Sequence, residues 1–159
     1  MESKPLQLPA LDPASVDAVS GSTYPPEFAK RMGVRIKRRL GNVLGLTHIG
    51  VNLVELAPGG QSAMRHWHTS EDEFIYLLQG ELTLVTNAGE QVLTPGMAAG
   101  FPAGKHDAHH FINRSQASAR YLEVGEHIER DNAFYPDDDV MWVETEDGVV
   151  AAHKDGRRY

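Results

Sequence analysis

Two histidines and a glutamate stand at spacings that could build a metal site. His66 and His68 are separated by one residue, and four residues lie between His68 and Glu73. Side chains alternate between the two faces of a β-strand, so both imidazoles project from one face while Trp67 points away. If residues 72–78 form the next antiparallel strand, the Glu73 carboxylate can lie opposite them. Two nitrogens and one oxygen are the nucleus of a divalent metal site.

Glycines frame this stretch. Five residues separate Gly60 from His66, and six separate Glu73 from Gly80. Glycines at strand ends mark the turns that fix strand register. A lone His-X-His pair is a weak signal, because such histidines often lie in a core or on a surface without any ligand. The glutamate and the glycines make a metal site the better interpretation.

A second stretch, residues 96–113, also has glycine, proline and histidine at defined spacings. Five residues separate Gly96 from the Pro-Ala-Gly triplet at 102–104, and three residues separate His109 from Asn113. Together the two stretches resemble the paired motifs of the cupin superfamily. The first motif matches at every specified position. The second departs once, because four residues lie between Gly104 and His109 where the family pattern has two.

The resemblance implies a metal site with four ligands from this chain. His66, His68 and Glu73 match the family positions directly, and His109 is the fourth because it keeps the spacing to Asn113. His106 and His110 do not keep that spacing. Three imidazoles and a carboxylate suit one divalent ion, which could be iron(II), manganese, nickel, cobalt or zinc. The remaining coordination positions would be open to water or substrate, as in catalytic sites.

Several polar residues near these stretches are candidates for contacting a substrate or supporting the ligands. The amide of Asn113 is expected to support a ligand or fix a turn more than to bind metal. The other candidates are Gln61, Tyr121, Glu123, Arg65 and Tyr76.

Composition limits the kinds of partner. The 159 residues are 41% hydrophobic and 23% charged, which suits one domain with a sizeable core. A formal net charge of -7 disfavours a nucleic-acid partner, whose binding needs a basic face. No apolar run approaches a membrane span and the first residues lack a signal-peptide pattern, so we expect no membrane partner and a cytoplasmic protein. With no cysteine, any metal is held by nitrogen and oxygen.

The chain divides into an arm, a barrel and an extension. Residues 1–33 are proline-rich and predict an irregular arm outside the sheet ladder, with one helical turn at 26–32 and a structural role favoured over an active-site one. The basic segment 33–40 predicts an edge strand whose charges are solvated, with an anion site as the alternative. Residues 126–159 predict an extension packed on the barrel or on a partner subunit, with a hairpin about residues 146–148.

Short strands between glycine and proline turns predict an all-β fold for residues 34–125. The resemblance, which covers residues 47–125, implies a double-stranded β-helix, the cupin jelly-roll barrel. A homodimer is expected because open sheet edges need cover. The strands are expected at 47–56, 62–68, 73–78, 81–86, 91–93, 97–101, 108–113 and 119–124.

Three classes of function remain open. The resemblance to small bacterial cupins named as sugar phosphate isomerases favours a metal-dependent isomerase of a sugar or sugar phosphate, in which a nearby base shuttles a carbon-bound proton. An iron(II) dioxygenase would use the same four ligands. A noncatalytic module that binds a small ligand is the third class. Regulatory cupins are usually fused to a helix-turn-helix. No amphipathic helix pair precedes residue 47, so this third class is less favoured than the two enzymes.

Overall fold

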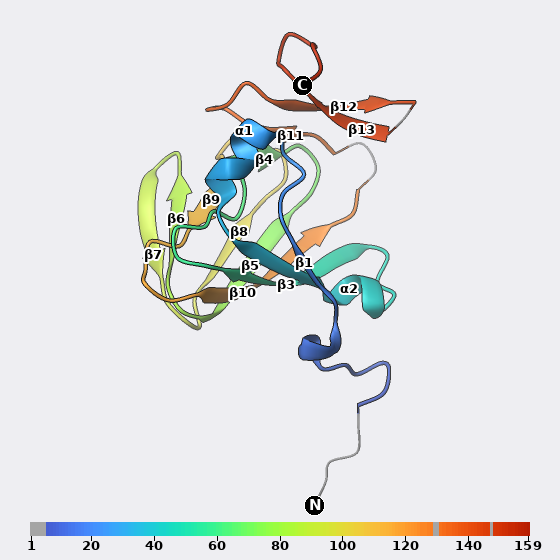
Figure 1. Ribbon diagram of the computed structural model, residues 1–159, viewed down its shortest axis with the longest axis vertical. Helices are drawn as coiled ribbons and strands as arrows, with labels where there is room; N and C mark the ends of the chain where they lie inside the picture. The colour runs from blue at the N-terminus through green and yellow to red at the C-terminus, as the bar shows by residue number, and fades with distance from the viewer. Residues whose placement is uncertain (1–5, 129–130, 147) are drawn as a thin grey trace, which may run out of the picture.

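Two β-sheets face each other in the computed structural model, which describes residues 6–128, 131–146 and 148–159 (Figure 1). The larger sheet has six strands and the smaller has three, and every pairing within them is antiparallel. The larger sheet follows the order β1 (Ala18–Ser20), β2 (Arg35–Arg39), β3 (Ile49–Leu56), β10 (Ala119–Glu126), β5 (Glu73–Gln79) and β8 (Ala98–Phe101). The smaller sheet follows the order β7 (Gly89–Leu93), β6 (Leu82–Thr86) and β9 (His110–Ile112).

One apolar core lies between these sheets. Alternation along β5 turns Ile75 and Leu77 inward, where they meet Leu84 and Phe111 from the smaller sheet. Fully burying a leucine stabilises the fold by about 1.5–3 kcal/mol. The predicted double-sheet jelly roll is therefore confirmed, with strand ends shifted by a residue or two from those expected, except that the strand expected at 62–68 is reduced to 67–68. The core consists of Val54, Leu56, Ile75, Leu77, Leu82, Leu84, Leu93, Phe111, Ala119 and Tyr121.

The N-terminal segment is more ordered than its prolines led us to expect. It contains two 3₁₀ turns, η1 (Pro13–Ser15) and η2 (Lys30–Met32), and one helical turn, α1 (Pro26–Ala29), where a helical turn was predicted. Contrary to the prediction, β1 joins the ladder by pairing with β2. The prolines lie at 5, 9, 13, 25 and 26, so residues 14–24 keep the N–H groups that a ladder needs.

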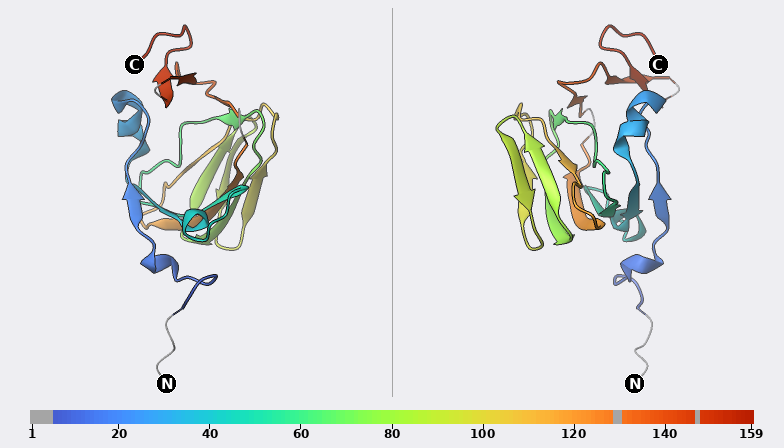
Figure 2. Two further views of the ribbon diagram at one scale, coloured as in Figure 1. Left: turned by 90° about the vertical axis from the view of Figure 1, so that its right-hand side faces the viewer. Right: turned by 60° about the vertical axis from the view of Figure 1, so that its left-hand side comes forward.

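The C-terminal segment packs against this arm at one end of the barrel (Figures 1 and 2). Strand β11 (Ala133–Phe134) pairs with β4 (Trp67–His68), and β12 (Met141–Thr145) pairs with β13 (Gly148–Ala152) as the predicted hairpin. Residue 147 of its turn lies outside the described residues. Phe28 and Met32 of the arm share a buried cluster with Tyr135 and Val140.

Short helices occur at the barrel surface as well, including α2 (Leu40–Val43), which the sequence did not predict. Of the helices within the described residues, none has the length and apolar character needed to cross a membrane.

Gly80 offers a test of how tightly the first motif is packed. Its φ is +80°, and a Cβ there would lie 2.7 Å from the Ser118 carbonyl oxygen and 2.8 Å from the Ala119 Cα. Gly59 is a matched control, since its φ is +78° and no described atom would lie within 4 Å of its Cβ. Gly59→Ala should lower the free energy of unfolding by about 1–2 kcal/mol from backbone strain alone. Gly80→Ala should lose about 1–3 kcal/mol more, because the added methyl group overpacks the site.

Urea unfolding of both variants measures the difference. Equal losses in the two variants would show that the contact with β10 is not tight.

Candidate metal centre

The two motif histidines reach the site from different local structures. His68 ends the short strand β4, while His66 lies outside it in an isolated bridge with His109. The His66 N–H donates to the His109 carbonyl at 3.1 Å, and the His109 N–H donates back to the His66 carbonyl at 2.8 Å. The predicted strand over 62–68 is thus mostly irregular. The two-residue spacing still brings both imidazoles to the same carboxylate.

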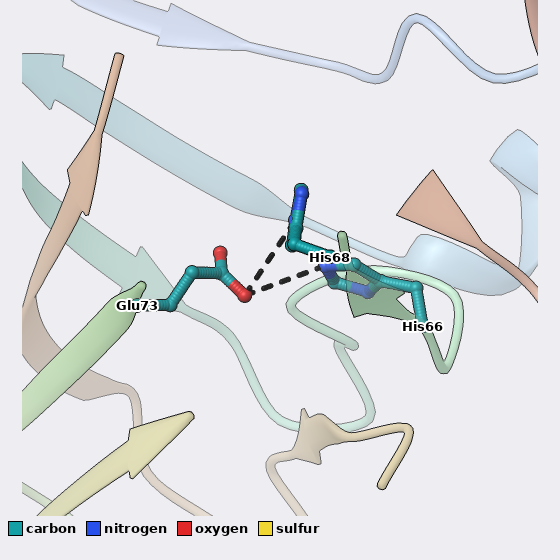
Figure 3. Close-up of side chains that lie close together, drawn as sticks. All are labelled: His66, His68 and Glu73. Carbon is teal, nitrogen blue, oxygen red and sulfur yellow. Dashed lines mark ion pairs between the residues drawn. The ribbon is translucent and has the colours of Figure 1, made fainter. Parts of the chain in front are cut away.

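Glu73 is the point on which the imidazoles converge. It is the first residue of β5, and its Oε2 lies 3.7 Å from His66 Nε2 and 3.6 Å from His68 Nε2 (Figure 3). His109 Nε2 lies 3.0 Å from the same oxygen. The ligand atoms of His66, His68 and Glu73 all lie within 4.8 Å of one another. The structure therefore gathers the four residues that the motifs pointed to.

Hydrogen bonds on the far side of two rings set their protonation. His66 Nδ1 donates to the Met64 carbonyl at 2.7 Å, and His68 Nδ1 donates to Asp131 Oδ2 at 2.5 Å. A carbonyl and a carboxylate accept protons, so Nδ1 carries the hydrogen in both rings. The Nε2 atoms consequently present lone pairs toward Glu73. This is the orientation that metal-binding histidines adopt.

Asp131 was not found by sequence reasoning. It lies in the extension, 63 positions from His68, and no motif marks it. The carboxylate also accepts the Ser70 N–H at 2.7 Å and the Glu71 N–H at 3.2 Å, so the loop after β4 fixes its position. These bonds account for the close approach of His68, Glu71 and Asp131 without a second ion.

The electrostatics of the cluster favour a bound cation. Burial lowers the pKa of His66 to about 4, against the opposing attraction of Glu73. Burial raises the pKa of Glu73, but His109 and the other two imidazoles outweigh it and bring that pKa to about 2. Within the part of the chain that the structure describes, Glu73 Oε2 is buried without a hydrogen-bond partner. A buried carboxylate that faces three imidazole nitrogens is a donor set that fits a divalent ion.

The other histidines of the second stretch point elsewhere. The His106 ring stacks on Trp67 with 4.0 Å between centroids, and His110 Nδ1 bonds the Ala63 carbonyl at 3.1 Å. The His109 ring stacks on the Phe101 ring, with 3.4 Å between the ring centroids and 4° between the ring planes. This stacking fixes the plane of the His109 ring beside Glu73. The structure thus places the histidine chosen by its spacing to Asn113, and not its neighbours, at the cluster.

A cavity opens on this cluster from inside the barrel. Of the substrate candidates, Tyr121 and Glu123 line it, but Gln61 and Asn113 do not. Burial raises the pKa of Tyr121 well above its usual value, so its hydroxyl stays protonated. A second cavity reaches Glu73 and His109 and is lined by a different set of residues, including Trp67 and Lys105.

Arg65 and Tyr76, the remaining candidates, have other surroundings. Arg65 forms an ion pair with Asp137 at 2.6 Å, which ties the loop after β3 to the extension. Tyr76 is 38% exposed on the outer face of β5, because its neighbours at 75 and 77 face the core. Neither Arg65 nor Tyr76 is among the described residues that line the cavity.

Sequence reasoning placed two further cavity residues on the surface. Arg35 and Lys37 line the cavity, although the basic segment was predicted to be a solvated edge strand. Because β1 takes the edge position, β2 becomes an inner strand, and its residues 35 and 37 pair with Leu56 and Val54 of the core. The available signal was their spacing of two, which places both charges on one face.

Asn113 has a role in the fold that can be tested. It is fully buried, and its Nδ2 donates to the Leu56 and Ala117 carbonyls, both at 2.8 Å. Its Oδ1 accepts the Ser115 N–H at 3.0 Å and the Ser115 hydroxyl at 2.8 Å. Asn113→Ala should therefore lower the free energy of unfolding by about 2–4 kcal/mol, because it leaves buried partners unsatisfied.

Ser115→Ala is the control, since it deletes one hydroxyl from the same turn and should cost less than about 1 kcal/mol. Thermal or urea unfolding compares the two variants. A small loss for Asn113→Ala would show that the turn holds without the amide.

The sequence and the fold were compared with those of known proteins. The model of the Cupin domain family matches residues 52–125. A crystal structure described as a sugar phosphate isomerase of a cupin superfamily, from Silicibacter pomeroyi, is 40% identical, covering 95% of this chain and 96% of that one with a TM-score of 0.89. None of the curated proteins compared with the sequence matches it.

Two other solved structures are similar over less of the chain. A protein from Acidithiobacillus ferrooxidans, provisionally named a sugar phosphate isomerase, is 28% identical over 79% of this chain and 80% of that one, with a TM-score of 0.70. The polyketide cyclase RemF from Streptomyces resistomycificus is 23% identical over 74% of this chain and 78% of that one, with a TM-score of 0.60. The last comparison shows a common fold only.

Proposed function

Because the chain belongs to the cupin superfamily, we propose that it is a metal-dependent enzyme of the sugar phosphate isomerase type. One divalent ion would be held by His66, His68, Glu73 and His109. The observation that carries this proposal is the convergence of three imidazole Nε2 atoms on the buried Glu73 Oε2. The similarity to the Silicibacter pomeroyi protein over nearly the whole chain supports the reaction class.

The ion would be zinc, iron(II), manganese, nickel or cobalt, since the ligand set suits each of these. When bound, it supplies a Lewis acid that polarises neighbouring substrate oxygens and makes the adjacent C–H more acidic. The protein must then provide a group that moves the proton between carbons. Glu123 fits this role, because it is the one carboxylate besides Glu73 among the described residues that line the cavity.

Other residues position Glu123 for this task. Its Oε1 accepts hydrogen bonds from Lys37 Nζ at 2.6 Å and from Asn52 Nδ2 at 3.0 Å. These bonds come from β2 and β3, so three neighbouring strands fix the carboxylate in the cavity wall. The apolar side chains around it, such as Ile75 and Phe111, limit the access of water to the reacting atoms.

An iron(II) dioxygenase is the second candidate, because the same three imidazoles and carboxylate suit iron(II) with open positions for oxygen. The isomerase is favoured by the similarity already described and by the charged lining of the cavity. A small polar substrate and a second copy of this chain are the partners that we propose.

The ligand set is tested by two matched histidine variants. His109→Ala should retain less than about a tenth of the bound ion, because removing a direct nitrogen donor costs more than the 10–100-fold loss typical of outer partners. His106→Ala should retain the ion, since its ring stacks on Trp67 away from Glu73. Metal analysis of protein purified without a histidine tag measures both.

Both variants should stay folded, because the jelly roll has its own apolar core, and the metal-free form should only melt at a lower temperature. Loss of the ion from His106→Ala with retention in His109→Ala would reverse the assignment of the second motif.

The reaction class is tested by following a panel of aldose and ketose phosphates in D₂O by proton NMR. The metal-loaded protein should interconvert at least one pair and exchange the transferred hydrogen with solvent. Glu123→Gln should keep its metal and lose about 10²–10⁴-fold in rate, the range typical of a general base. Substrate loss coupled to oxygen uptake by the iron(II)-loaded protein would instead identify a dioxygenase.

A further inference from the structure

The inner wall of the cavity carries an unusual row of positive charge. Strand β2 pairs Arg35 with Leu56 and Lys37 with Val54, and both partners are fully buried core residues. Alternation therefore turns both cationic side chains toward the barrel interior and not toward bulk solvent. Charged side chains are normally excluded from such positions unless they have a partner or a ligand.

Protein acceptors hold both cations in place but do not use all their donors. Arg35 Nη1 donates to the Ser62 carbonyl across the barrel, and Lys37 Nζ donates to Glu123. A guanidinium has five N–H donors and an ammonium has three. Each side chain is thus fixed in direction while keeping N–H groups for a further acceptor.

A neutral donor in the same wall also lacks a partner. Tyr121 is fully buried and lines the cavity. Among residues 6–128, 131–146 and 148–159, its hydroxyl finds no hydrogen-bond partner. A buried hydroxyl without a partner is unfavourable, because it has lost its bonds to water. An oxygen-rich ligand in the cavity would relieve this cost while using the free donors of Arg35 and Lys37.

Charge distinguishes this cavity from the second one that reaches the same ligands. Of the described residues that line the second cavity, Glu71, Glu73 and Asp107 carry carboxylates and only Lys105 is a lysine or arginine. The first cavity balances Arg35 and Lys37 against two carboxylates, so a divalent ion at the proposed site would make its lining positive. Only the first cavity therefore has the sign that attracts an anion.

We propose that Arg35 and Lys37 bind the phosphate group of the substrate, with its sugar carbons directed toward His66, Glu73 and His109. This assignment rests on the proposed isomerase function and names the part of the site that would select phosphorylated substrates. A phosphate ester has several terminal oxygens, so it can accept from Arg35, Lys37 and Tyr121 together.

The cationic row also marks a route into the barrel. Arg35 and Lys37 line a neighbouring hollow together with Arg39 and residues 19–23 of the N-terminal arm. Arg39 is exposed, whereas the other two side chains are partly buried. The charges thus lead from solvent beside β1 (Figure 2, blue) to the interior of the site. Such a gradient increases the local concentration of an anionic substrate.

The test is calorimetric binding of inorganic phosphate to the metal-loaded protein, with acetate as a carboxylate control. Arg35→Gln and Lys37→Gln should each weaken phosphate binding by at least about tenfold, because each removes a charge-assisted donor. Arg39→Gln is the matched control from the same face of the same strand, and screening should keep its effect within about twofold.

One variant should act in the opposite direction. Glu123→Gln removes the negative charge that competes for Lys37, so phosphate should bind about threefold or more tightly. A purely structural role for the pair predicts no gain in this variant. Urea unfolding and metal content of each variant show whether the cavity is intact.

The assignment would be overturned if folded, metal-loaded Arg35→Gln and Lys37→Gln bound phosphate with unchanged affinity. It would also be overturned if Arg39→Gln lost as much affinity as they do, or if acetate bound as tightly as phosphate.

The phosphate site and the isomerase function can fail separately. Isomerisation with an unchanged KM in Arg35→Gln would reject the phosphate site alone. Arg35-dependent phosphate binding without turnover of any sugar phosphate would support the site and reject the isomerase.

Discussion

The structure depends on a carboxylate that is buried among three imidazoles. Taking Glu73 out of water costs several kcal/mol unless positive charge or hydrogen bonds compensate. Its Oε2 faces the Nε2 atoms of His66, His68 and His109 at 3.0–3.7 Å, and within the described residues it has no hydrogen-bond partner. The turns and backbone bridges of both motifs hold the Glu73 carboxylate in this position despite the cost of burying it.

Support for this cluster comes from parts of the chain that are far apart in sequence. The backbone bridge between His66 and His109 holds two of the proposed ligands together, and Asp131 of the extension orients a third, His68. The arm and the extension share a buried cluster that includes Met64, whose carbonyl holds the His66 ring. The extension and the arm are therefore parts of the site's support, and not only a covering of the barrel.

Sequence reasoning reached the parts of the molecule whose physical causes are local. Short strands between glycine and proline turns predicted the all-β fold, and the resemblance to cupins specified the jelly roll. Three of the proposed ligands, His66, His68 and Glu73, were chosen from their spacing around Trp67, although His66 lies outside strand β4. Contacts such as His68 with Asp131 could not be predicted, because they depend on how the extension returns to the barrel. Arg35 and Lys37 were predicted to be solvated because residues 33–40 were taken for an edge strand. The sequence pattern of an edge strand does not differ from that of an inner strand, and β1, which takes the edge position, was not predicted.

The departure in the second motif shows which spacings a site constrains. His109 and Asn113 are four positions apart on one extended segment, and backbone bonds tie both ends: His109 to His66, and Asn113 to Gly59 and Gly60. A residue inserted between them would turn one side chain to the opposite face. Upstream, residues 102–108 form a loop in which the Gly104 N–H donates to the His68 carbonyl at 2.8 Å. A loop absorbs two extra residues without moving the strand, so the spacing to Asn113 identifies the histidine that lies beside Glu73, and the spacing to Gly104 does not.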